Sequence, residues 1–198
     1  MNSTRTARSA LVLFGLHALL GFPAYGGEPD LAWVERSRAL ADQLTSELQA
    51  ELGQAMQQGG PVAAVAVCKS RAPQIAARLS ASSGAEVGRT AIRLRNPANA
   101  PDDLERAVMQ DFAAGLSSGL PAATAPPAAI FESRSARGIE RRYLRAIVMQ
   151  PVCLACHGAT LAPELAMAIA RDYPLDTATG FETGQLRGAV TVRWPATH

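Results

Sequence analysis

The chain has 198 residues, of which 48% are apolar and 18% charged, and this suits one domain with a substantial core. Its 19 Lys and Arg residues nearly balance its 17 Asp and Glu residues, and no basic block is present. This balance gives no support to nucleic-acid binding. The sequence shows no internal repeat and no second domain boundary.

Residues 1–26 have the three parts of a secretory signal peptide. Arg5 and Arg8 precede an apolar stretch at 10–20, and Ala24-Tyr25-Gly26 has the small-x-small form of a cleavage site. The stretch is too short to span a bilayer, although an uncleaved anchor is the alternative. We therefore predict a periplasmic protein with a single mature domain at 27–198. Without the two signal-peptide arginines, 17 basic side chains face 17 acidic ones.

The mature chain is predicted to begin with helices. Apolar residues at spacings of three, four and six predict a long helix over 31–58, stopped by Gly59-Gly60-Pro61. The apolar run at 62–68 fits a helix or a strand on periodicity alone. Its alanines favour a helix that continues to Ala77, with Pro73 starting a second piece.

The middle of the chain alternates between irregular and regular segments. Val87–Leu94 is rich enough in branched residues for a strand, and the two prolines of 95–101 exclude regular structure there. Asp102 is expected to cap a helix that runs to about Leu116. Residues 117–127 are predicted as a surface loop.

The last third is predicted to form most of a small sheet. Strands are expected at 129–133 and 139–148, joined by a polar turn at 135–138, and again at 187–194. A short helix over 163–173 opens with proline at its first turn. The predicted fold is α+β: a long N-terminal helix, a small antiparallel sheet, and short helices packed on it.

The segment Cys153-Leu154-Ala155-Cys156-His157 is the attachment motif of c-type haem. Its two thiols add across the porphyrin vinyl groups, and the adjacent histidine becomes the proximal iron ligand. Two intervening residues carry the chain through most of a helical turn, so both sulfurs reach one edge of the macrocycle. Export fits this chemistry, because c-type haem is attached outside the bacterial cytoplasm. We therefore predict haem c as the cofactor.

A redox dithiol and half of a zinc site use the same cysteine spacing, but both fit this sequence less well. A thioredoxin-type dithiol needs a surrounding βαβ pattern. A structural zinc site needs four ligands, and the sequence has no second cysteine pair.

Cys68 is the third cysteine, and an unpaired thiol in an oxidising compartment needs a reason. Three roles are open to it: a buried cysteine that acts as a small hydrophobe, an intermolecular disulfide, or a thiolate bound to the iron opposite His157. Methionine, a histidine or an open site are the alternatives for that sixth position. The candidate side chains are Met56, Met109, Met149, Met167 and His198. Each methionine lies on a plausible core face, which favours packing.

Several short motifs occur in a characteristic order along the chain. They are Val67-Cys68-Lys69, Gly88-Arg89-Thr90, Arg95-Asn96-Pro97-Ala98-Asn99-Ala100-Pro101, Cys153–Gly158, Tyr173-Pro174 and Gly188-Ala189-Val190. Together they resemble a family of bacterial c-type haem domains long described as a domain of unknown function. The resemblance covers residues 31–194.

This resemblance implies a PAS-like fold around one covalent haem, with Cys68 as axial thiolate and His157 as proximal ligand. The family occurs as secreted proteins and as sensor regions of histidine kinases. Arg89 and Arg95 are candidates to pair with the haem propionates. Asn96 and Asn99 are expected to hold the proline-rich turn through side-chain to backbone hydrogen bonds.

Three functions remain open at this stage. They are a redox or gas-responsive sensor read by an unknown periplasmic partner, a periplasmic electron carrier, and a gas-binding cytochrome with an open sixth site. The predicted strands argue against a four-helix gas-binding cytochrome. No catalytic constellation is visible, so we do not expect an enzyme.

Overall fold

The computed structural model describes residues 31–119 and 126–197. The predicted signal peptide, the middle of the predicted loop at 117–127, and His198 lie outside the described residues. Within the described part of the chain, no helix is both long and apolar enough to cross a membrane.

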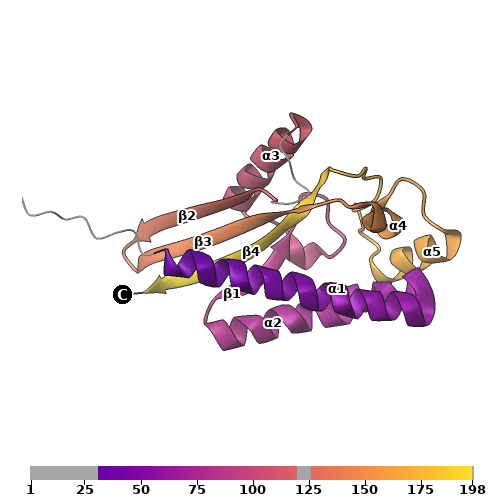
Figure 1. The fold of residues 1–198 in the computed structure, drawn as a ribbon, viewed down its shortest axis with the longest axis horizontal. Coiled ribbons are helices and arrows are strands. Elements are labelled where there is room, and N and C mark those ends of the chain that lie inside the picture. The colour runs from indigo at the N-terminus through magenta and orange to yellow at the C-terminus, as the bar shows by residue number, and fades with distance from the viewer. Residues whose placement is uncertain (1–30, 120–125, 198) are drawn as a thin grey trace, which may run out of the picture. The chain divides into compact units, whose positions relative to one another are not determined.

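Four antiparallel strands form the sheet of the described chain (Figure 1). Its order is β1 (Glu86–Thr90), β4 (Leu186–Thr197), β3 (Gly138–Val148) and β2 (Ala128–Ser135). Strands β2 and β3 form the predicted hairpin, and the predicted final strand pairs with both β1 and β3. The α+β architecture is therefore confirmed, and its PAS-like character stays a prediction.

Strand β1 is shorter than predicted, ending at Thr90 and not at Leu94. The backbone N–H of Ala91 donates to the carbonyl of Asn99 at 3.2 Å, which turns the chain away from β4. Gly188 makes this turn possible, because a Cβ there would lie 2.4 Å from the carbonyl oxygen of Thr90.

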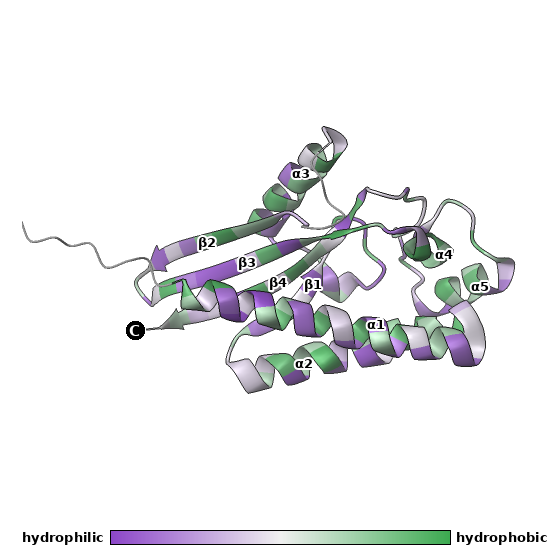
Figure 2. Ribbon diagram, in the orientation of Figure 1, coloured by the Kyte–Doolittle hydropathy of each residue, from purple (hydrophilic) through white to green (hydrophobic). Residues whose placement is uncertain are grey.

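Helices cover both faces of the sheet. The helices α1 (Ala32–Ala66) and α2 (Ala72–Ser83) pack on one face, where their apolar side chains meet those of β1, β3 and β4. The helix α3 (Asp103–Ser117) packs on the other face, through Val108, Met109 and Phe112. In Figure 2, apolar and polar residues alternate in bands along α1, as expected for a helix with one buried side.

The N-terminus of α3 follows the prediction closely. Asp102 accepts a hydrogen bond from the backbone N–H of Glu105, and the Glu105 side chain accepts one from the N–H of Asp102. This reciprocal arrangement is a capping box. The helix α5 (Pro163–Asp172) also confirms the prediction, with proline in its first turn.

The proline-rich segment contains one element that the sequence prediction excluded. Pro97–Asn99 form a single 3₁₀ turn, because Asn96 Oδ1 accepts a hydrogen bond from the N–H of Ala98 at 3.0 Å. The predicted side-chain role of Asn96 is thus confirmed, whereas Asn99 acts through its backbone carbonyl.

The predicted stop after residue 58 is a kink and not an end. Gly59 and Gly60 leave the helical conformation, and Pro61 restarts the helix at once, so α1 extends to Ala66. A five-residue π-helix, Val67–Arg71, then leads into α2. The apolar run at 62–68 is helical, and Pro73 lies in the first turn of α2.

We expect Gly60→Ala and Gly53→Ala to change stability in opposite directions. Gly60 has φ 69° and ψ −165°, a conformation reserved for glycine, so alanine there should cost about 1–3 kcal/mol. Gly53 lies in exposed regular helix with open space at its Cβ position, and alanine there should stabilise by up to about 1 kcal/mol. Urea unfolding measures the free energy of unfolding of both variants. A change of the same sign in both would contradict the non-helical conformation of Gly60.

Candidate functional site

The Cys-x-x-Cys-His segment forms one tight helical turn. A 3₁₀ turn, Pro151–Cys153, runs directly into the short helix α4, Leu154–His157. The backbone N–H of Gln150 donates to Cys153 Sγ at 3.4 Å, which closes the turn. Cys153 and Cys156 are three residues apart on this turn, so they share one side of it. Both thiols are half-buried, and burial raises the pKa of Cys156.

The imidazole of His157 forms one hydrogen bond among the described residues. Its Nδ1 lies 2.7 Å from the carbonyl oxygen of Ala178, which can only accept, so Nδ1 carries the proton. The other ring nitrogen, Nε2, has no hydrogen bond among the described residues. Burial, followed by the charges of Arg187 and Arg95, lowers the pKa of His157 to about 3. The imidazole is therefore neutral, and its Nε2 carries a lone pair that could bind a metal.

Arg95 organises the loop that holds His157. Its side chain forms an ion pair with Asp176 at 3.2 Å, and both side chains are only 8% exposed. Arg95 Nη2 also donates to the carbonyls of Cys156 at 2.8 Å and Ala178 at 3.3 Å. Three separate segments thus meet at this guanidinium. A propionate contact of Arg95 stays a prediction, and the hydrogen bonds present here give the residue a structural role.

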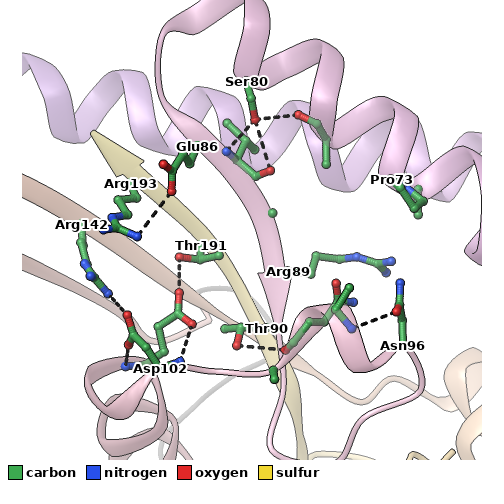
Figure 3. A pocket seen from close by; sticks show the side chains of 18 of the residues that line it. Pro73, Ser80, Glu86, Arg89, Thr90, Asn96, Asp102, Arg142, Thr191 and Arg193 are labelled. Carbon is green, nitrogen blue, oxygen red and sulfur yellow. Dashed lines mark hydrogen bonds and ion pairs between the residues drawn. The ribbon is translucent and has the colours of Figure 1, made fainter. Parts of the chain in front are cut away.

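Arg89 points into the cavity described below, and its guanidinium has no hydrogen-bond partner among the described residues (Figure 3). Burial lowers its pKa. It retains some accessible surface, because the cavity reaches it from solvent.

Arg187 is a site residue that sequence reasoning misses. Burial, together with Arg95 and Arg89, lowers its pKa to about 10. A bulge places it here: Ile147 pairs with Gly188 but Val148 pairs with Leu186, so Arg187 is the extra residue of β4. Leu186 and Ala189 consequently both pack on the α3 face, and Arg187 turns to the opposite one. A bulge leaves no clear pattern in one sequence, so little in the sequence signals this residue.

Cys68 lies on the π-helix between α1 and α2, with its side chain half-buried. It is close enough to Cys156, Arg89, Arg187 and Tyr173 to affect the protonation of each. π-Helical turns are often found at functional sites. Next to it, Lys69 Nζ forms an ion pair with Asp172 at 3.0 Å and so ties the π-helix to the end of α5.

The structure therefore brings all six predicted site residues into one region, although they span positions 68 to 157. The methionines considered as alternative sixth ligands fall into a buried pair and an exposed pair. Met109 and Met149 are fully buried, and Met149 packs beside Cys153. The prediction that each methionine lies on a core face is wrong for Met56 and Met167, which are 38% and 67% exposed.

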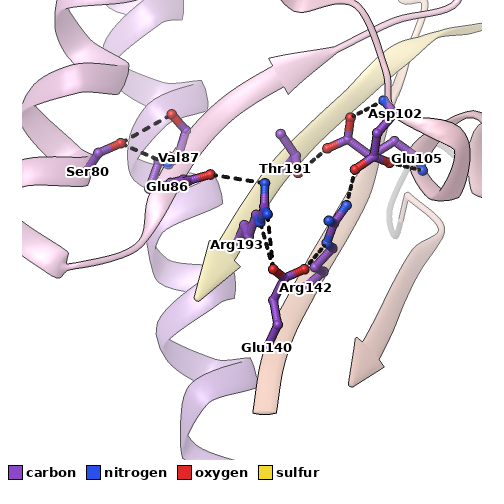
Figure 4. Close-up of polar contacts among 9 residues, drawn as sticks. All are labelled: Ser80, Glu86, Val87, Asp102, Glu105, Glu140, Arg142, Thr191 and Arg193. Carbon is purple, nitrogen blue, oxygen red and sulfur yellow. Dashed lines mark hydrogen bonds and ion pairs between the residues drawn. The ribbon is translucent and has the colours of Figure 1, made fainter. Parts of the chain in front are cut away.

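A cavity of about 590 Å³ extends from Cys68 along β1 (Figure 3). Cys68 and Arg89 line one end, and ion-paired side chains of β3, β4 and α3 line the other. Figure 4 shows that second end: Arg142 pairs with Asp102 and Glu140, and Arg193 with Glu140 and Glu86. The hydrogen bond from Arg142 lowers the pKa of Glu140. Both guanidiniums at this end are thus paired with carboxylates of the protein itself.

No group of three or more His, Cys, Asp or Glu side chains suited to a metal ion occurs in the part of the chain that the structure covers. The two residues predicted as axial ligands, His157 and Cys68, lie on separate elements, α4 and the π-helix. This geometry is that of an α+β protein whose site joins a Cys-x-x-Cys-His turn to a distant third cysteine.

The chain belongs to the Tll0287-like family, whose model matches residues 29–195. It is similar to the crystal structure of the cyanobacterial haem protein Tll0287, with 27% sequence identity and a TM-score of 0.55. That similarity covers 84% of this chain and 95% of the other. A search of curated proteins finds no match.

We expect Asp176→Asn to destabilise the protein by about 3–5 kcal/mol, because it leaves Arg95 buried without its counterion. Glu35→Gln is the matched control, since it removes the carboxylate of a solvent-exposed pair with Arg38 and should change stability little. Chemical denaturation of both variants compares them. Equal effects would show that Arg95 does not depend on Asp176.

Proposed function

We propose that this chain is a periplasmic monohaem c-type cytochrome with His157 and Cys68 as axial iron ligands, acting as a redox sensor. The observation that carries the proposal is the orientation of His157. Its Nδ1 is bonded to Ala178, its Nε2 is left for a metal, and its turn also presents Cys153 and Cys156.

The chemistry of the donor set fits haem. A metal centre made of side chains needs three or four of them, whereas a porphyrin supplies four nitrogens and needs only axial ligands. His157 and Cys68 meet that need. The similarity to a cyanobacterial haem protein supports the same cofactor.

Cys153 and Cys156 are the residues for covalent attachment. Each thiol would add across one vinyl group, with a new S–C bond to one carbon and the thiol proton to the other. The tight turn from Pro151 to His157 fixes both sulfurs and the imidazole within one short segment.

Arg89 and Arg187 are the best placed residues to hold the two propionates. Burial disfavours the charge of both guanidiniums, and Asp176 is already paired with Arg95. Two carboxylates would compensate these charges through bidentate hydrogen bonds. Arg187 therefore joins the predicted pair, Arg89 and Arg95, as a propionate candidate.

Sensing is favoured over simple electron transfer by the position of Cys68. An axial thiolate stabilises ferric iron, and reduction would favour protonation and release of the sulfur. The cavity that begins at Cys68 gives solvent and small molecules a route to this side of the site. Release would change the π-helix that joins α1 to α2, a conformational signal that a partner can read. An electron carrier or a gas-binding cytochrome is the alternative function.

We predict that Cys68→Ala converts the ferric electron paramagnetic resonance spectrum from low-spin to high-spin or ligand-exchanged. Cys68→Met should remain low-spin with a raised midpoint potential, because a neutral thioether replaces an anionic sulfur. Ser70→Ala, on the same π-helix, is the control and should leave both measurements unchanged. An unaltered spectrum in Cys68→Ala would exclude the thiolate ligand.

Covalent attachment is tested separately. In protein from cells that mature c-type cytochromes, we expect haem to remain with the denatured wild-type chain and to be lost from Cys153→Ala/Cys156→Ala. Haem staining after denaturing electrophoresis, with fractionation of the periplasm, measures both attachment and location. Haem that dissociates from the wild-type chain would contradict the c-type assignment.

Sensor and carrier differ in kinetics. A sensor should exchange electrons slowly, take up CO slowly and only when ferrous, and change hydrogen exchange near the π-helix on reduction. Fast reduction by a periplasmic donor without a change in hydrogen exchange would favour the electron carrier. Rapid ligand uptake in both oxidation states would favour a gas-binding cytochrome with an open sixth site.

A further inference from the structure

Phe181 packs directly against the proposed proximal histidine. The rings of Phe181 and His157 meet edge to face, with centroids 6.3 Å apart and planes at 86°. The backbone N–H of Phe181 also donates to the carbonyl of His157 at 2.9 Å. Phe181 is only 5% exposed, so this contact is fixed within the core.

Two guanidiniums hold the same phenyl ring. The Arg93 guanidinium lies 4.0 Å from the Phe181 centroid, and that of Arg187 lies 5.5 Å from it. Arg187 Nη1 donates to the carbonyl of Arg93 at 3.1 Å, and Arg93 Nε donates to the carbonyl of Thr177 at 3.1 Å. The phenyl ring therefore lies against two guanidiniums from separate segments of the chain. Each guanidinium is held in place by a hydrogen bond to a backbone carbonyl.

The backbone before Phe181 is built for this contact. Gly180 has φ 74°, and its N–H donates to the carbonyl of Gly158 at 2.9 Å. This positive φ is one that L side chains rarely adopt, so glycine suits the position, where a Cβ would lie in ordinary contact with Arg93 Nη2 at 3.4 Å. The backbone of residues 180 and 181 thus runs beside residues 157 and 158, and this places the phenyl ring against the imidazole.

We propose that Phe181 is a positioning residue for His157, and that Arg93 and Arg187 hold it in place. The inference rests on the proposed haem ligation. The hydrogen bond from Nδ1 to Ala178 restrains rotation of the imidazole about its Cβ–Cγ bond. It still leaves a range of ring planes, because a hydrogen bond tolerates tens of degrees of misalignment. The edge-to-face contact with Phe181 selects one ring plane. The plane of an axial imidazole affects the anisotropy of ferric low-spin iron, so this role has a spectroscopic signature.

The test compares Phe181→Leu with Phe112→Leu. Phe112 is similarly buried but packs on the α3 face, so its substitution makes the same chemical change away from His157. In ferric holoprotein, we expect Phe181→Leu to shift or broaden the g-values and Phe112→Leu to leave them at the wild-type positions. Unchanged g-values in Phe181→Leu would overturn the proposal.

A second readout uses the protein without haem. Nitrogen-15 NMR of the His157 ring should show a slowly exchanging Nδ1 proton in the wild type and several-fold faster exchange in Phe181→Leu. Equal exchange in the two would overturn the positioning role. If wild-type protein shows this Nδ1 proton but holds no haem, the proposed function fails while the contact between the two rings stands.

Arg93→Gln tests the contact of Arg93 with Phe181 without enlarging a core cavity, should Phe181→Leu fail to fold. Arg38→Gln, which removes an exposed guanidinium elsewhere, is its matched control. We expect Arg93→Gln to shift the g-values in the same direction as Phe181→Leu, by a smaller amount. Identical spectra for Arg93→Gln and Arg38→Gln would show that Arg93 does not hold Phe181 in place.

Discussion

The buried ion pair between Arg95 and Asp176 is the interaction on which the site depends. It joins the proline-rich segment after β1, the end of the Cys-x-x-Cys-His turn, and the loop that supplies Ala178. The Ala178 carbonyl fixes the His157 tautomer. Asp176 and Ala178, two residues of one loop, therefore link Arg95 to the proposed proximal histidine. A buried pair of this kind stabilises little by itself, because desolvation opposes the attraction. Its value here is that it specifies one loop conformation.

The parts of this structure that the sequence predicts are those controlled by local rules. Asp102 and Glu105 form the expected capping box, and the apolar alternation of Val190 and Val192 places the last strand correctly. The Cys-x-x-Cys-His turn follows from spacing alone. Cys68 is singled out by chemistry, since a third cysteine in a chain with a predicted signal peptide needs a role, and by family resemblance; its role as an axial ligand stays a prediction.

The parts that the sequence does not predict depend on contacts between distant segments. Arg187 enters the site through a bulge, and the role of Phe181 depends on residues 24 and 88 positions away in the chain. Asp176 looks like an ordinary loop carboxylate until Arg95 lies against it. The Gly59–Gly60 kink shows a related limit: the two glycines predict a stop, but Pro61 restarts the helix because a proline needs no hydrogen bond in a first turn.

On the proposed ligation, the charges around the site would act against one another, and this sets the direction in which each would tune the iron. An axial thiolate from Cys68 would place a negative charge on the metal and favour the ferric state. Arg89, Arg95 and Arg187 place positive charges nearby, and only Asp176 compensates them among the buried carboxylates described here. Any positive charge that the propionates leave uncompensated would favour the ferrous state, but it would also stabilise the thiolate. Release of the sulfur as a thiol would therefore need a proton supplied from solvent. The cavity that leads from Cys68 to solvent provides such a route. Such opposed charges would make the proposed iron respond to a small change in either one, and this favours the proposed redox switch over a simple carrier.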